Sequence, residues 1–257
     1  MLNKILFLTK ERTNTNYIVC SDITEANTED TLIITDCQND ARGYLMQGFA
    51  VLYTTVEDEF AGGIPYVCTG LSDCDDGYLE LVFARIKKIP LRILETERTI
   101  VREITVEDLP LLYDLYDDEL VTRYVEPLYE YEEEKLFTEK YIENMYGFYG
   151  YGLWLVFHKE SGELVGRMGI SIRNIDGIDE NELGYIVHRK YRGQGYAKEV
   201  CNAIITYAKD VLDIEKIYIL TRSENVESIG LTRDLGFEYK SDIIQGGDEY
   251  KFFVKST

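Results

Sequence analysis

The sequence has 257 residues, with 47 Asp and Glu against 27 Lys and Arg and a net charge of -20. This length allows one large or two smaller domains, and with 45% apolar residues the chain can bury a core, so general disorder is excluded. The acidity also excludes a general nucleic-acid binder, because neutralising phosphates requires basic clusters. We therefore expect a partner of positive charge.

Short apolar runs and few metal-binding residues exclude two further classes of protein. The longest apolar stretches, such as 31–35 and 49–53, are far shorter than the roughly 20 residues that cross a bilayer. Residues 1–9 lack the apolar core of a signal peptide. Five cysteines occur without CxxC spacing beside only two histidines, so we expect free thiols and no metal site. We expect a cytoplasmic protein without a membrane partner.

The first 93 residues alternate short β-type runs with helical segments. The predicted strands are 5–8, 17–20, 32–35, 50–54 and 66–69, and the predicted helices are 40–47 and 75–87. This alternation is typical of a small parallel α/β domain. Pro90 then interrupts the pattern, and we place a domain boundary near residue 93.

From Leu94 onward the pattern predicts a second domain, 94–257, in which most strands follow one another. The predicted strands are 94–103, 152–158, 164–173, 183–188, 216–221, 237–243 and 249–255. The predicted helices are 106–116, 132–146, 195–211 and 226–235. Ser161-Gly162 and Gly246-Gly247 provide turns between consecutive strands.

Acidic residues are concentrated in one part of this second domain. Between Glu107 and Glu143 there are 13 acidic residues against Arg123, Lys135 and Lys140, a net charge of -10. For any single carboxylate, a solvated helical face is the simplest interpretation.

A basic loop with two glycines stands out in this acidic chain. The predicted strand 183–188 leads through Gly193 and Gly195 directly into a helix, with Arg189 and Arg192 close by. Backbone N–H groups in such a loop, together with a helix N-terminus, can bind phosphate. The two glycines alone would indicate only a tight turn. Neither the P-loop pattern GxxxxGK nor the dinucleotide pattern GxGxxG is present.

Two motifs in sequence order resemble those of the GNAT superfamily of acetyl-CoA-dependent N-acetyltransferases. Arg192, Gly195 and Ala197 match its pyrophosphate motif, Arg/Gln-x-x-Gly-x-Gly/Ala, and Asn225 precedes a helix that ends in the family's Leu-Gly-Phe at 235–237. The opening segment is similar to the branch that includes ribosomal-protein N-terminal and small-amine acetyltransferases. The resemblance covers about residues 94–255. It implies an α/β (α+β) fold whose mixed, largely antiparallel sheet is flanked by helices.

The resemblance also implies where acetyl-CoA, the cosubstrate, would bind. Strand 183–188 would splay from strand 216–221 and pair with the pantetheine arm, while the amides of 193–197 would hold the pyrophosphate. The cofactor-binding residues implied in this way are Ile186, Val187, His188, Arg192, Gly193, Gln194, Gly195, Tyr196, Ala197, Lys198 and Asn225.

The expected reaction is direct attack of a primary amine on the thioester. An alkylammonium with a pKa of about 10.4 must first lose a proton, and the family often places a carboxylate where Glu182 stands, so we take Glu182 as general base. The alternative interpretation of Glu182 is an ordinary carboxylate at the end of a strand, without a catalytic role. Many members protonate the leaving thiolate with a Tyr, but Thr232 occupies that position. Ser228 is then a candidate donor, or a helix cap, and Tyr185 is a further catalytic candidate or a packing residue.

In this family the first two helices and their connection border the acceptor pocket, which gives the acidic segment a role. We expect a cationic acceptor: a small amine, a Lys side chain or the N-terminus of a basic peptide or protein. The alternative is a noncatalytic CoA-binding sensor or interaction protein, as the absence of the usual Tyr would allow. The sequence leaves a homodimer open.

Residues 31–53 resemble a late segment of the haloacid-dehalogenase-like fold, with Asp36 and Asp40 in its DxxxD pattern. Active members use such aspartates to help hold Mg²⁺. Residues 4–11 contain no Asp, so the nucleophile of that family is missing and phosphatase activity is not expected. The resemblance implies a truncated, noncatalytic unit for docking, dimerisation or ligand sensing.

Overall fold

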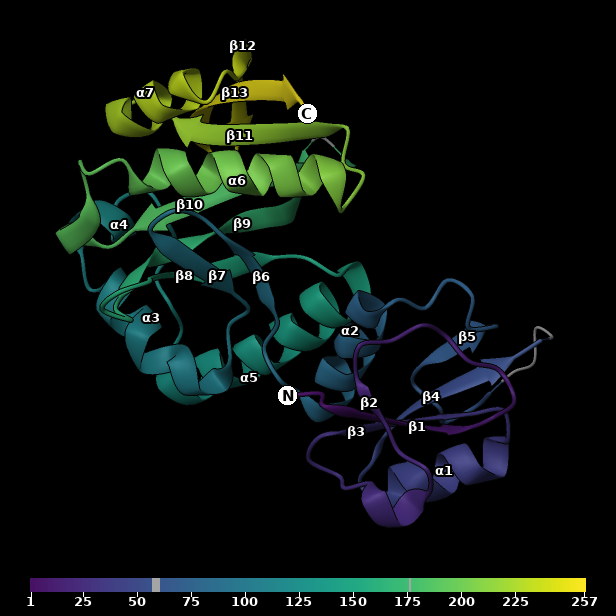
Figure 1. Ribbon diagram of the computed structural model, residues 1–257. Helices are drawn as coiled ribbons and strands as arrows, with labels where there is room; N and C mark the ends of the chain where they lie inside the picture. The colour runs from purple at the N-terminus through teal and green to yellow at the C-terminus, as the bar shows by residue number, and fades with distance from the viewer. Residues whose placement is uncertain (57–60, 176) are drawn as a thin grey trace. The chain divides into compact units, whose positions relative to one another are not determined.

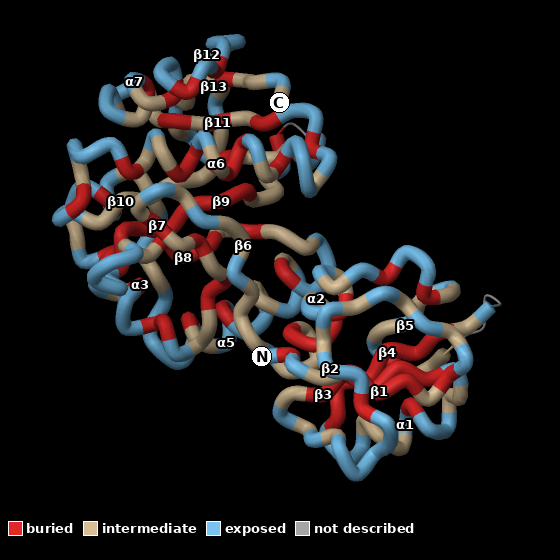
Figure 2. The backbone as a smooth tube through the Cα atoms, in the orientation of Figure 1, coloured by how far each residue is buried: buried red, intermediate tan, exposed pale blue. Residues whose placement is uncertain are grey.

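The computed structural model describes residues 1–56, 61–175 and 177–257 and divides into two compact units, Met1–Leu91 and Arg92–Thr257. Buried segments form a separate interior in each unit (Figure 2). None of the helices in the described ranges is long and apolar enough to span a membrane.

The first unit is a five-stranded sheet in which every neighbouring pair of strands is parallel, in the order β2-β1-β3-β4-β5. Its strands are β1 (Lys4–Leu8), β2 (Ile18–Val19), β3 (Thr31–Thr35), β4 (Ala50–Thr55) and β5 (Val67–Thr69). Its helices are η1 (Ile23–Glu25), α1 (Gln38–Met46) and α2 (Asp76–Lys87). The predicted parallel sheet is confirmed.

Alternation along β3 explains why the two longer helices cover opposite faces of this sheet (Figure 1). Leu32 and Ile34 pack in one core with Phe83 of α2, whereas Ile33 packs in another with Ala41 of α1. Successive side chains of a strand point to opposite faces, so a strand that is buried throughout needs cover on both sides.

The second unit contains an eight-stranded sheet in the order β12-β13-β11-β10-β9-β8-β7-β6. Only the β10–β11 pair is parallel among its described pairs. The strands are β6 (Arg92–Glu95), β7 (Thr99–Arg102), β8 (Leu153–His158), β9 (Leu164–Ile175), β10 (Ile178–Val187), β11 (Lys216–Arg222), β12 (Glu238–Gln245) and β13 (Asp248–Ser256). The prediction of a mixed, largely antiparallel sheet flanked by helices is confirmed.

Helices cover both faces of the middle of this sheet. They are η2 (Val106–Asp108), α3 (Leu109–Tyr116), α4 (Glu119–Thr122), α5 (Tyr131–Tyr141), the π-helix η3 (Ile142–Tyr149), η4 (Arg189–Tyr191), α6 (Tyr196–Asp210) and α7 (Val226–Asp234). Trp154 of β8 meets Tyr207 of α6 edge to face at 5.8 Å. On β9, Arg167 donates to the hydroxyl of Tyr116 on α3. The polar side chain of Arg167 is therefore directed toward α3.

Several predicted elements of this unit are wrong in their bounds, and the strand predicted at 183–188 is β10, which begins at Ile178. The expected strand 94–103 is two strands, β6 and β7, because a turn closed by Thr96 N–H and the carbonyl of Thr99 at 2.9 Å separates them. The predicted helix 106–116 begins as η2, where Thr105 and Asp108 cap each other, and only then becomes α3. The predicted helix 132–146 changes into a π-helix that continues to Tyr149.

Candidate active site

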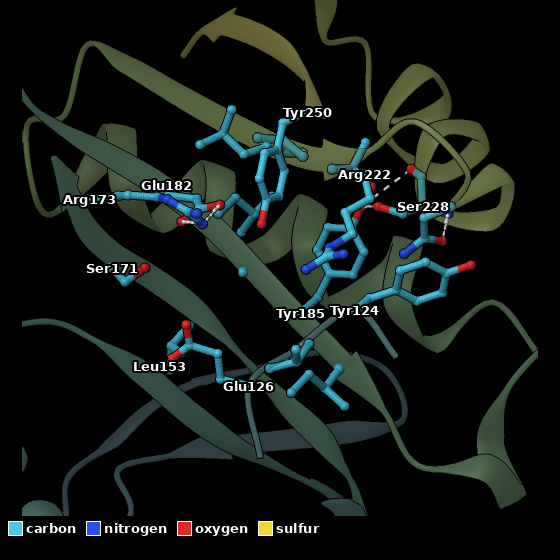
Figure 3. Close-up of a pocket in the computed structure, with 18 of the residues that line it drawn as sticks. Tyr124, Glu126, Leu153, Ser171, Arg173, Glu182, Tyr185, Arg222, Ser228 and Tyr250 are labelled. Atoms are coloured by element: carbon cyan, nitrogen blue, oxygen red, sulfur yellow. Dashed lines mark hydrogen bonds and ion pairs between the residues drawn. The ribbon is translucent and has the colours of Figure 1, made fainter. Parts of the chain in front are cut away.

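A cavity opens in the second unit where two parallel strands part. β10 and β11 pair in register only at Glu182 and Tyr218. A cavity of about 870 Å³ is lined by residues 183–186 of β10, 219–222 of β11 and the segment 122–127 after α4 (Figure 3). The expected splaying of these two strands is therefore present.

Glu182 lies in the wall of this cavity, inside β10 and not at its start as the sequence indicates. Nη1 of Arg173 donates to both of its carboxylate oxygens at 3.2 Å, and the backbone N–H of Leu220 also donates to it. Burial raises the pKa of Glu182 above its ordinary value, while Arg173 and Leu220 oppose that rise. A carboxylate with a raised pKa is a competent proton acceptor near neutral pH.

Tyr185 and Ser228, the other catalytic candidates, form a hydroxyl cluster in the same cavity (Figure 3). Their hydroxyl oxygens lie 2.8 Å apart, and the Tyr185 hydroxyl is 3.3 Å from Oγ1 of Thr232. Burial raises the pKa of Tyr185, and its hydrogen bonds to Ser228 and Thr232 oppose that rise. Thr232 is fully buried and donates a hydrogen bond to the Ser228 carbonyl. It therefore helps to fix the position of Ser228 in the cluster.

The basic loop has the backbone geometry that an anion site requires. Gly193 and Gly195 have φ angles of 72° and 83°, which favour glycine. α6 then begins at Tyr196 with no side-chain cap, so its first-turn N–H groups lack the partner that a capping residue supplies. Uncapped N–H groups after a left-handed glycine can bind an anion such as a phosphate group.

Most polar side chains of this loop bind other parts of the protein. Arg192 contacts Asp118 at 2.9 Å and the Val187 carbonyl at 3.0 Å, and Gln194 donates to the Lys190 carbonyl. His188 contacts Asp114 at 3.1 Å, Lys198 lies 3.7 Å from Asp234, and the buried Tyr196 ring lies beneath Arg98. The loop thus presents mainly its backbone to a ligand.

The structure brings together only some of the residues predicted from sequence. Ile186 and Asn225 line the cavity with the three catalytic candidates, and Asn225 also caps α7 by accepting from the Ser228 N–H. The other predicted cofactor residues do not line this cavity: Val187, His188, Arg192, Gly193, Gln194, Gly195, Tyr196, Ala197 and Lys198.

Several arginines at the site were not identified from the sequence. Arg98 donates to the carbonyl of Gln194 and pairs with Glu199 at 2.6 Å, and its guanidinium lies 3.9 Å from the centre of the Tyr196 ring. These contacts connect the basic loop to the β6–β7 turn. Arg173 and Arg222 line the cavity. No local motif marks them, because their partners are distant in sequence.

The acidic excess does not face the cavity. Of the 13 acidic residues between Glu107 and Glu143, a segment described throughout, only Glu126 lines it, and most of the others are exposed. Asp114 and Asp118 instead contact His188 and Arg192 of the basic loop. The expectation of an acidic acceptor pocket is therefore wrong for most of the segment, since most of its carboxylates are exposed to water and away from the cavity.

The second unit is similar in sequence to known acetyltransferases. Residues 98–238 match the family described as "Acetyltransferase (GNAT) domain". The "Uncharacterized protein YkkB" of Bacillus subtilis (strain 168) is 28% identical over 151 residues, covering 58% of this chain and 87% of the relative. The "Uncharacterized N-acetyltransferase p20" of Bacillus licheniformis is 25% identical over 158 residues, covering 58% and 83%.

Solved structures share the fold at lower identity. An acetyltransferase from Agrobacterium tumefaciens str. C58 superposes with a TM-score of 0.56 at 22% identity, covering 65% of this chain and 95% of its own. An acetyl transferase from Salmonella typhimurium, described as modifying the N-terminal serine of ribosomal protein L7/L12, has a TM-score of 0.55 at 19% identity and covers 65% and 99%.

Proposed function

The chain belongs to the GNAT family of acetyltransferases, and from this premise we propose that it transfers the acetyl group of acetyl-CoA to a primary amine by direct attack. The observation that carries the proposal is that Glu182, Tyr185 and Ser228 line one and the same cavity at the β10–β11 opening. A proton acceptor and hydroxyl donors that line one cavity suit a reaction that removes one proton and returns another.

In the proposed reaction, acetyl-CoA supplies the acetyl group as an activated thioester. The N–H groups of residues 193–197 would hold the diphosphate, and the end of β10 at Ile186 and Val187, with the following His188, would orient the pantetheine arm. Glu182 takes the proton from the attacking ammonium, directly or through water. Backbone N–H groups of β10 stabilise the charge that develops on the carbonyl oxygen.

The proton for the departing thiolate comes from the hydroxyl cluster. A phenol with an ordinary pKa of about 10 is much closer to a thiol at about 8.5 than a serine hydroxyl is. We therefore assign the donor role to Tyr185 and an orienting role to Ser228, whose Oγ lies 2.8 Å from the phenol oxygen.

The test is release of CoA thiol by the full chain from acetyl-CoA in a mixture of amines. Amine-dependent release at a rate well above hydrolysis supports the proposal. Binding of acetyl-CoA without amine-dependent release would instead support the noncatalytic sensor. Small amines and peptide N-termini both belong in the mixture, because one structural neighbour is described as acting on a protein N-terminus.

For the first unit we propose a noncatalytic α/β module, related to the haloacid-dehalogenase-like fold, in a protein that works in the cytoplasm. Support comes from its parallel sheet, in which Asp36 follows β3. The residue after β1, where a nucleophilic aspartate would be needed, is Thr9. Hydrolysis of p-nitrophenyl phosphate with Mg²⁺, abolished by Asp36→Asn, would overturn this proposal.

A further inference from the structure

A buried arginine in the cavity wall lacks a counter-charge. Arg167 of β9 is 9% exposed and lines the cavity. Nη1 donates to the Tyr116 hydroxyl at 3.3 Å, the guanidinium lies 5.5 Å from the Tyr141 ring, and Nε is buried without a partner. Within the described ranges no carboxylate lies at ion-pair distance from it. Burying an unpaired charge is costly, so such a group calls for an explanation.

The other charges of the cavity show that Arg167 is exceptional. Arg173 pairs with Glu182, and Arg222 pairs with Asp248 at 2.6 Å. Two remaining charged groups of the lining, Arg123 and Glu126, are exposed to water and opposite in sign. Once these pairs are set aside, the buried charge left in the lining is one guanidinium.

We propose that Arg167 binds a carboxylate of the amine acceptor, so that the substrates are primary amines that also carry a carboxylate. This inference rests on the proposed amine acetylation and names the acceptor class. A guanidinium in a partly dry wall binds a carboxylate through charge-assisted hydrogen bonds, and it rejects a neutral analogue because its own charge then stays unpaired.

Strand register sets the spacing between the two groups of such an acceptor. In the β9–β10 pair, Ser171 lies opposite Glu182 and Arg167 lies opposite Ile186, four residues along the sheet. Four residues of strand span about 13 Å, so the two charged groups are well separated along the sheet. An amine and a carboxylate separated by several bonds fit better than an α-amino acid.

The experiment measures kcat/KM of the full chain for matched pairs of acceptors. One arm compares ω-amino acids, from β-alanine to 6-aminohexanoate, with their amides; a second compares Gly-Asp amide with Gly-Asn amide, to separate a free acid from an acidic peptide. We expect a preference for the carboxylate of roughly tenfold or more at the best chain length. Arg167→Met should abolish that preference, because the acid and its amide then have similar kcat/KM values, and Arg233→Met, which removes an exposed charge outside the cavity, should retain it.

Calorimetry with 6-aminohexanoate in the presence of CoA gives a readout that does not need turnover. Binding to the wild type that Arg167→Met weakens roughly tenfold supports the inference. Equal rates for acids and amides in the wild type, or binding that Arg167→Met leaves unchanged, would overturn it and leave amine acetylation intact. Thiol release with no amine at all would count against the proposed function instead.

Discussion

Nη1 of Arg173 lies 3.2 Å from each carboxylate oxygen of Glu182. The two residues come from neighbouring strands, β9 and β10, and both line the cavity. Arg173 therefore stabilises the ionised form of a carboxylate that burial would otherwise neutralise. The role of Glu182 as base and the effect of Arg173 on its pKa can therefore be tested with separate substitutions.

Replacing the base should slow chemistry without loosening the cofactor. We expect Glu182→Gln to lower kcat/KM by about 10²- to 10³-fold, the usual size of a general-base contribution, with an unchanged dissociation constant for acetyl-CoA. Steady-state kinetics and calorimetry measure the two quantities. Glu215→Gln, which alters an exposed carboxylate outside the cavity, is the matched control. Full activity of Glu182→Gln would rule out the role of base.

The acid limb of the pH–rate profile should follow the titration of the Glu182 carboxylate. Burial raises the pKa of Glu182, so activity should fall at a higher pH than for an ordinary glutamate, as the pH drops through that raised value. Arg173→Met removes the cation that favours the ionised form, so the limb should move to higher pH by about one unit. The limb is measured as kcat against pH under saturating substrates; a shift to lower pH would contradict this assignment.

The hydroxyl cluster predicts an ordered series of variants. We expect Tyr185→Phe to lower kcat by about 10- to 100-fold and Ser228→Ala to lower it less, because the phenol carries the proton and the serine orients it. The double variant should be no slower than Tyr185→Phe, since both act on one proton. Tyr239→Phe on exposed β12 serves as control. A larger loss from Ser228→Ala would transfer the donor role to Ser228.

A backbone substitution tests the anion loop. Gly195→Ala places a side chain at φ 83°, at a cost of about 1–2 kcal/mol in this region, and relief of the strain would turn the N–H groups at the start of α6. We expect affinity for CoA to fall roughly tenfold or more. Gly162→Ala creates the same backbone conflict at φ 70° in the β8–β9 turn and should leave CoA affinity unchanged. Calorimetry on both variants decides, and equal affinities would exclude the loop as the diphosphate site.

Features encoded over short stretches could be predicted from the sequence. The parallel first unit follows from short apolar runs that alternate with helices, and the turn-to-helix loop follows from Gly193 and Gly195. The candidates Glu182, Tyr185 and Ser228 follow from a family resemblance, and the structure places all three in one cavity. The bounds of the split strand at 94–103 were missed because the turn depends on specific hydrogen bonds between Thr96 and Thr99 and not on composition.

By itself, the sequence determined the parallel sheet of the first unit and the glycine-containing turn that leads into α6, because each depends on neighbours within a few residues, while the mixed sheet of the second unit followed from the family resemblance. Only the tertiary structure decided the charge of the cavity. Strand register brings Arg173 to Glu182 and leaves Arg167 buried without a carboxylate, while most carboxylates of the acidic segment are exposed to water. A net charge of -20 sums over all of these groups, whereas recognition depends on the few that face one cavity.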